Sequence, residues 1–145
     1  MKEKLKEALN EEFQVYNPIA FYTRLAELFS EYRNEIKPEL LGYIERCLVD
    51  VCKKHDVSVR WLQYTPYFND GDECVFSVHC FEPFRVNEEG DERNIGYYKA
   101  QPMIKDFNQV FSEFSDDDFL WLYGDHAQII VTEEDGLTIK EYEDW

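Results

Sequence analysis

Basic residues are scarce in this sequence: it holds 15 lysines and arginines but 31 aspartates and glutamates, for a formal net charge of −16. Direct nucleic-acid binding depends on Lys and Arg that neutralise phosphates, and anionic membrane surfaces attract the same two residues. The charge therefore argues against both kinds of partner. It leaves three interpretations: a basic protein partner, a divalent cation, or an acidic surface that only maintains solubility.

Long apolar segments are also absent. No window approaches the roughly 20 apolar residues of a membrane-spanning helix, and the charged start MKEKLKEALNEEF lacks the apolar core of a signal peptide. We therefore expect a soluble, cytoplasmic protein. Because the chain has 145 residues, of which 44% are hydrophobic, we expect a single domain over residues 1–145 with one core.

Recognisable catalytic and metal-binding patterns are missing as well. The four cysteines lack the close pairs, with two residues between them, that are typical of zinc modules; they are Cys47, Cys52, Cys74 and Cys80. There is no nucleophile elbow, phosphate-binding loop, Gly-rich dinucleotide turn or His-Glu-x-x-His run. We therefore expect a non-enzymatic protein with no catalytic residue, no metal and no cofactor.

Apolar residues recur at the helical period through the first third of the chain. The pattern predicts one helix over residues 2–15, a second that starts at Asn17–Pro18 and breaks at Lys37–Pro38, and a third from about Pro38 to Lys54. A further helix is predicted from about Pro102. A short one follows Ser115, because the acids 116–118 suit a helix start. Residues 84–101, which mix charges with glycines, predict a long loop.

Elsewhere the apolar period is two, which is typical of strands. Residues 57–62 and 74–81 predict a hairpin through Asp70–Gly71, and residues 128–132 and 137–142 predict another through the turn 133–136. Apolar residues on both faces of the first pair indicate central or covered strands. The fold class is therefore α+β, with N-terminal helices packed on an antiparallel sheet built from two hairpins and a further helix between the hairpins.

The acids are unevenly distributed. Residues 1–81 hold 14 acids and 10 bases, whereas residues 82–145 hold 17 acids and 5 bases. A surface dense in carboxylates can imitate the phosphates of a duplex and occupy the basic groove of a nucleic-acid-handling protein. The candidate partner-binding residues are Glu88, Glu89, Asp91, Glu92, Asp116, Asp117, Asp118, Glu133, Glu134, Asp135, Glu141, Glu143 and Asp144.

The stretch QYTPYFNDGDECVFSV, within residues 60–82, resembles a hairpin that recurs in small uncharacterised proteins of tailed bacteriophages and of some bacteria. The resemblance brings no catalytic residues with it. It implies a context in which small acidic proteins are directed at host proteins, including restriction and CRISPR machinery. For a phage-encoded protein, the expected location is the cytoplasm of the host cell.

Together, these features predict an acidic binding protein, an inhibitor or DNA mimic that occupies a basic site on a host nucleic-acid-handling or defence protein. One alternative is a structural or scaffolding component of a phage complex, in which aromatic residues form a homo-oligomer interface. The other is a small metal-dependent enzyme that uses Asp116, Asp117, Asp118, Asp125 and His126.

Overall fold

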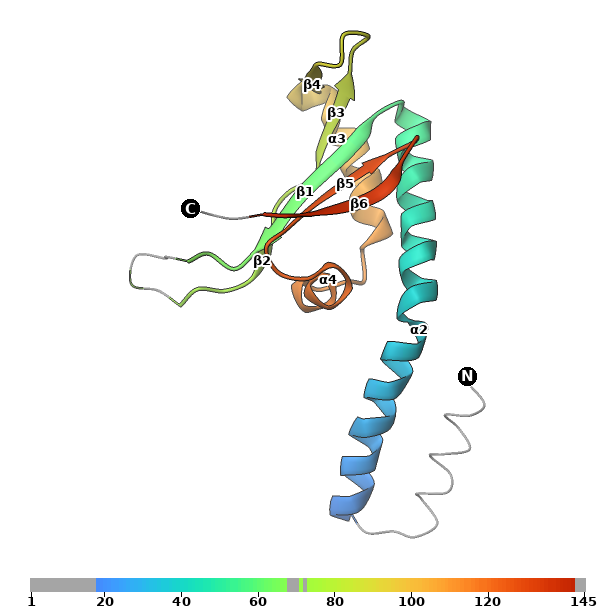
Figure 1. Cartoon of the computed structure of the whole chain (residues 1–145), viewed down its shortest axis with the longest axis vertical. Coiled ribbons are helices and arrows are strands. Elements are labelled where there is room, and N and C mark those ends of the chain that lie inside the picture. The colour runs from blue at the N-terminus through green and yellow to red at the C-terminus, as the bar shows by residue number, and fades with distance from the viewer. Residues whose placement is uncertain (1–17, 68–70, 72, 143–145) are drawn as a thin grey trace. The chain divides into compact units, whose positions relative to one another are not determined.

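The computed structural model describes residues 18–67, 71 and 73–142, and the helix predicted over residues 2–15 lies outside them. The elements in chain order are α2 (Pro18–His55), β1 (Ser58–Tyr64), β2 (Ser77–Val78), β3 (Glu82–Val86), β4 (Glu92–Asn94), α3 (Tyr97–Val110), α4 (Asp116–Tyr123), β5 (Ala127–Thr132) and β6 (Gly136–Glu141) (Figure 1). The chain divides into two compact units, residues 1–41 and 42–145, and the sheet belongs to the second. No helix within the described ranges combines the length and the apolar character that a membrane crossing requires.

Helix α2 begins at Pro18, as predicted, because the fixed φ and missing N–H of proline suit the first helical position. The predicted break at Lys37–Pro38 is wrong, since Pro38 lies inside the helix. An interior proline costs about 3 kcal/mol. Here, however, Ile36, Leu40 and Ile44 continue a four-residue apolar spacing across it, and good helix formers flank it on both sides.

The strands form one six-stranded antiparallel sheet in the order β4-β3-β1-β5-β6, with β2 also paired to β1. Strand β1 is therefore central, which its apolar residues predicted. With helices before the sheet and between its strands, the predicted α+β class is confirmed. The second predicted hairpin is confirmed as β5–β6, in which Thr132 pairs with Gly136.

The first predicted hairpin is present, but its second strand is much shorter than expected. Strand β2 comprises only Ser77–Val78 of the predicted strand 74–81, and it pairs with Gln63 and Tyr64. Residues 65–76 therefore connect the two strands in place of a tight turn. Within this connection Gly71 has φ +93°, which is the positive φ that a glycine turn position allows; its neighbours 70 and 72 lie outside the described residues.

The predicted long loop over residues 84–101 is wrong, because this segment contains a third hairpin, β3–β4. Asn87 N donates to Asp91 O (2.9 Å), and the Asn87 side chain accepts a hydrogen bond from Asp91 N (2.8 Å). Gly90 supplies a positive φ of +87° in the turn. Strand β4 is exposed throughout, so it carries no apolar alternation from which a strand is predicted, and backbone pairing alone defines it.

Helix α3 also starts earlier than predicted, at Tyr97, with Pro102 in its interior. Its first turn is held by Ala100 N, which donates to Gly96 O (2.9 Å). Helix α4 begins as predicted. Ser115 caps it and forms a reciprocal capping box with Asp118, in which Ser115 N donates to Asp118 Oδ2 (2.9 Å).

The helices of the second unit cover one face of the sheet. On that face β1 and β5 bury alternate residues, namely Val59, Trp61, Gln63, Ala127, Ile129 and Val131. Trp61 meets the rings of Phe81, Phe111, Phe119 and Tyr123, with centroids 5.1, 5.8, 6.3 and 5.7 Å away. Cys52 of α2 donates through Sγ to Val131 O (3.7 Å) on the same face. The aromatic core thus joins β1 to α3 and α4, and the end of α2 packs beside it.

One polar side chain, Gln63, is fully buried in this core. Its Oε1 accepts from Trp61 Nε1 (3.0 Å), while its Nε2 donates to the carbonyls of Phe119 (3.0 Å) and Gly124 (2.7 Å). The amide therefore connects β1 to the middle and to the C-terminal end of α4. Because a buried amide is tolerated only when it is hydrogen-bonded, these three contacts define where α4 sits on the sheet.

Candidate functional site

A cleft of about 760 Å³ lies where α2 ends and where two hairpin turns approach it. It is lined by three chain segments, which are Asp56–Ser58, Arg85–Asn87 and Thr132–Asp135. Four carboxylates and one guanidinium line it, so it carries an excess of negative charge. Because the segments are far apart in sequence, the cleft exists only in the folded second unit. We call it the acidic cleft.

The end of α2 positions the first carboxylate. Asp56 adopts a left-handed conformation with φ +53°, which is uncommon for a residue other than glycine. Asp56 N donates to Lys53 O (3.3 Å) and Val57 N to Cys52 O (3.0 Å), the hydrogen-bond pattern of a Schellman helix end. The turn directs the chain from α2 into β1 and leaves Asp56 exposed at the cleft.

Arg85 of β3 stabilises the same helix end. Its Nε donates to Asp56 O (2.9 Å) and its Nη2 to His55 O (3.1 Å). These carbonyls have no partner within the helix, and a cation there also complements the helix dipole. The guanidinium is thus held by backbone carbonyls, and within the described ranges it forms no ion pair with a cleft carboxylate. Its role in the cleft is to join β3 to α2.

The β5–β6 turn supplies the other three carboxylates, Glu133, Glu134 and Asp135. Thr132 Oγ1 accepts a hydrogen bond from Asp135 N (2.9 Å), and Gly136 closes the turn with φ +71°. On the far side of the turn, Glu45 Oε1 of α2 accepts from Leu137 N (2.8 Å). All three turn carboxylates are exposed. The hydrogen bonds that hold the turn use its backbone N–H groups and not these carboxylates.

The negative charge of the β5–β6 turn also acts on a buried cysteine, Cys52. Burial raises the pKa of the Cys52 thiol to about 12, and the negative charge of Glu133 acts in the same direction. The thiol therefore stays protonated and unreactive at neutral pH. The other cysteines are free thiols as well, so no disulfide constrains the cleft.

The other predicted acids of the β3 region divide into two groups. Glu88, Glu89 and Asp91 lie exposed in the β3–β4 turn, directly after the cleft residue Asn87. Glu92 lies on β4, where Arg60 binds it and also pairs with Glu82 (3.4 Å). Glu92 is therefore engaged within the sheet, while the turn acids border the acidic cleft.

The remaining predicted acids lie elsewhere. Asp116, Asp117 and Asp118 form the first turn of α4, at the end of the second unit away from the β3–β4 turn (Figure 1). Asp118 serves the capping box. Glu141 ends β6, and Glu143 and Asp144 lie outside the described residues. Among the predicted acids that the structure describes, those of the β5–β6 turn line the acidic cleft and those of the β3–β4 turn follow its lining residue Asn87.

The residues of the enzyme alternative are not assembled either. Asp116–Asp118 and the pair Asp125–His126 lie at opposite ends of α4. The Asp125 carboxylate accepts from Thr65 N, Thr65 Oγ1 and His126 N, each at 2.8 Å. The His126 ring is 3.8 Å away through Nε2, too long for a hydrogen bond. Among the residues that the structure describes, no three His, Cys, Asp or Glu side chains are grouped to hold a metal ion.

The hydrogen bonds that Asp125 accepts predict that its carboxylate stabilises the fold in a pH-dependent way. Partial burial, the largest single influence, would raise its pKa, but hydrogen bonds from Thr65 and from the His126 backbone outweigh it and hold the pKa below its usual value. A lowered folded-state pKa contributes stability above the usual carboxyl range, and this stability is lost as pH falls through the lowered pKa. Asp125→Asn should lower the free energy of unfolding by about 1 kcal/mol at pH 7. In urea unfolding the gap from wild type should close in acid; a gap independent of pH would contradict this.

Sequence reasoning missed two residues of the cleft, Asp56 and Arg85. Asp56 was missed because the candidate acids were chosen from the acid-rich residues 82–145, and Asp56 lies outside them. Its position between a helical and a strand pattern was the available signal, because helix ends favour residues that tolerate a left-handed conformation.

No family model, no curated protein sequence and no solved structure gives a significant match to this chain.

Proposed function

We propose that this chain is a non-enzymatic binding protein whose acidic cleft receives basic side chains of a protein partner. The observation that carries the proposal is the convergence of Asp56 with the turn carboxylates 133–135 on one cleft of about 760 Å³. Among the described residues, the only cation that lines it is Arg85, which is bound to backbone carbonyls. An entering Arg or Lys therefore meets several carboxylates at once.

The magnitude suits electrostatic recognition. Two unit charges 4 Å apart attract by about 1 kcal/mol in water and by about 4 kcal/mol near a protein surface. Several such contacts give useful affinity without an apolar interface, and they speed the encounter with a cationic partner. A protein site that binds nucleic-acid phosphates is positively charged and therefore complements the negatively charged acidic cleft. The resemblance of residues 60–82 to phage proteins suggests that the partner is a host defence or nucleic-acid-handling protein.

A charge-matched pair of variants tests the cleft. The cleft variant is Glu133→Gln, Glu134→Gln and Asp135→Asn together, and the control variant is Glu113→Gln, Asp116→Asn and Asp117→Asn together. Both remove three exposed charges. Neither variant removes the hydrogen bond from Asp135 N to Thr132 Oγ1 or changes the capping residue Asp118. A fluorescein-labelled oligoarginine peptide is the probe, with anisotropy as the readout.

The cleft variant should bind the peptide about tenfold more weakly than wild type, which corresponds to about 1.4 kcal/mol. The control variant should lose about twofold or less, because its charges are distant and screened beyond about 8 Å at physiological salt. Wild-type affinity should also fall as salt rises. Equal losses in the two variants would show that only net charge matters and would overturn the proposed cleft.

A further inference from the structure

The longest acid-free run within the acid-rich residues 82–145 carries cations. Between Arg93 and Lys105 the sequence RNIGYYKAQPMIK carries three cations and no aspartate or glutamate, although residues 82–145 hold 17 acids and 5 bases. Within the described residues none of these cations, Arg93, Lys99 or Lys105, forms an ion pair. Arg93 moreover lies directly opposite Arg85 in the β3–β4 register, an arrangement of like charges that is unfavourable by itself.

The same segment exposes two tyrosines. Tyr97 is 72% exposed and Tyr98 is 88% exposed, and their rings lie 5.3 Å apart in an edge-to-face pair. By contrast, Phe81, Phe111, Phe119 and Tyr123 are buried around Trp61. Tyrosine is a frequent anchor of protein interfaces, because its ring buries a large area and its hydroxyl can still hydrogen-bond.

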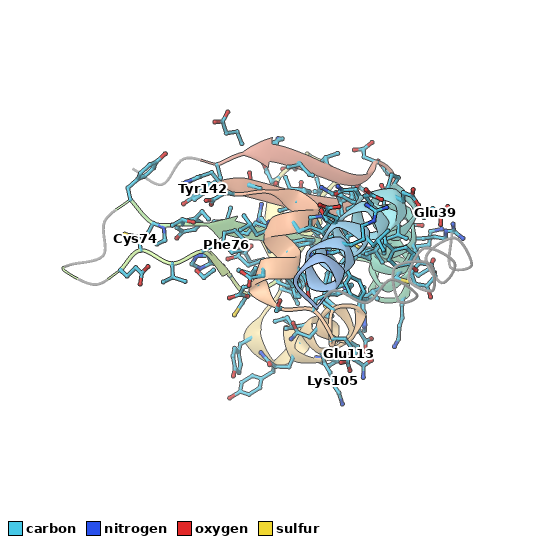
Figure 2. The ribbon with its side chains drawn as sticks, turned by 90° about the horizontal axis from the view of Figure 1, so that it is seen from below. Glu39, Cys74, Phe76, Lys105, Glu113 and Tyr142 are labelled. Carbon is cyan, nitrogen blue, oxygen red and sulfur yellow. The ribbon has the colours of Figure 1, made fainter. Side chains whose placement is uncertain are left out.

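The exposed face of α3 extends this region. Ala100, Met103 and Phe107 are buried against the sheet. The opposite face bears a hollow of about 450 Å³, lined by Gln101, Ile104, Lys105, Asn108, Gln109 and Ser112. Lys105 projects from α3 away from the sheet (Figure 2). We define the basic aromatic patch as Arg93, Tyr97, Tyr98, Lys99 and Lys105.

From this surface we propose that the chain associates with a second copy of itself, in which the basic aromatic patch of one copy docks on the acidic cleft of the next. The charges are complementary: three cations of the patch face four carboxylates, and the tyrosines supply the apolar contact that charge alone does not. Arg93 of the patch lies directly opposite Arg85 of the cleft, so the two surfaces adjoin, and a two-fold dimer in which each patch meets the cleft of the other copy satisfies both contacts. It covers the cleft, so self-association competes with binding of a basic partner.

Salt should have two opposing effects on this association. At low salt the net charge of −16 on each copy repels over long distances, since the Debye length is about 30 Å at 0.01 M. Near 0.15 M the length falls to about 8 Å, which screens the overall repulsion but preserves close ion pairs. Near 1 M the pairs weaken too. Self-association should therefore be strongest at intermediate salt.

Sedimentation velocity of the full chain, over a range of protein concentrations at these three salt levels, tests the proposal. The weight-average mass should rise with concentration and most steeply near 0.15 M. The patch variant Arg93→Glu/Lys99→Glu should remain monomeric, and so should the cleft variant Glu133→Lys/Glu134→Lys. An equimolar mixture of the two should associate again, because the reversed patch then fits the reversed cleft. All four positions are exposed, so circular dichroism should show unchanged folding.

A second pair of variants separates specific docking from general stickiness. Tyr98→Ser should weaken self-association about tenfold. Tyr43→Ser removes a tyrosine that is 64% exposed on α2 and should leave it unchanged. A monomer under every condition, or association that the patch variants do not alter, would overturn the proposal. The acidic cleft of the proposed function is the receiving surface here, but oligoarginine binding to a strictly monomeric protein would leave that function standing.

Discussion

Replacing Gln63 with leucine is expected to lower the free energy of unfolding by about 3–5 kcal/mol, although the change makes the core more apolar. The reason is that Gln63 hydrogen-bonds three groups, which are the buried Trp61 Nε1–H, the carbonyl of Phe119 and the half-buried carbonyl of Gly124. Leucine fills most of the volume but removes the partner of Trp61 Nε1–H and of the Gly124 carbonyl, and each orphaned group costs about 1–3 kcal/mol. The Phe119 carbonyl lies inside α4 and keeps its helix bond. Urea unfolding followed by circular dichroism measures the loss.

The matched control is Gln128→Leu. Gln128 lies on β5 with its side chain on the opposite face of the sheet, where it is half-buried and makes no hydrogen bond to the described residues. This change should alter stability by less than about 0.5–1 kcal/mol. If Gln63→Leu proved as mild as the control, the hydrogen bonds to α4 would contribute no net stability.

The second large effect is expected at Gly136, where Gly136→Ala should lower the free energy of unfolding by about 2–3 kcal/mol. A left-handed conformation costs an L-residue about 1–2 kcal/mol, and Gly136 has φ +71°. An added Cβ would also lie 2.5 Å from Glu45 Oε1. The Glu45 side chain would have to move, and its bond to Leu137 N (2.8 Å) would weaken. Thermal or urea unfolding at neutral pH is the measurement.

The same substitution elsewhere should have the opposite sign. Gly42 lies in α2, and an added Cβ there would meet no described atom within 4 Å. Gly42→Ala should therefore stabilise by up to about 1 kcal/mol through helix propensity. A further variant, Gly136→Asn, keeps the Cβ but tolerates the left-handed backbone, which separates strain from the clash with Glu45. Equal effects of alanine at both glycines would contradict the argument.

Local signals in the sequence predicted the elements whose determinants lie within a few residues. Pro18 marks the start of α2, Ser115 and Asp118 form the capping box of α4, and the β5–β6 hairpin turns through Asp135–Gly136. Each depends on a side chain or a φ angle next to the backbone that it organises. The break at Pro38 was wrong because good helix formers and a continued apolar spacing on both sides outweigh the proline. The loop over residues 84–101 was wrong because β4 is exposed throughout and only backbone pairing defines it.

The candidate site shows the same division more sharply. The sequence alone determined that the protein is strongly acidic, that its acids concentrate in residues 82–145, and that Glu133–Asp135 lie in a hairpin turn. Only the tertiary structure placed Asp56 and Arg85 beside that turn, and only it separated these acids from Asp116–Asp118. Charge is a sum over residues and can be read along the chain. Proximity depends on strand order and on where a helix ends, which long-range packing decides.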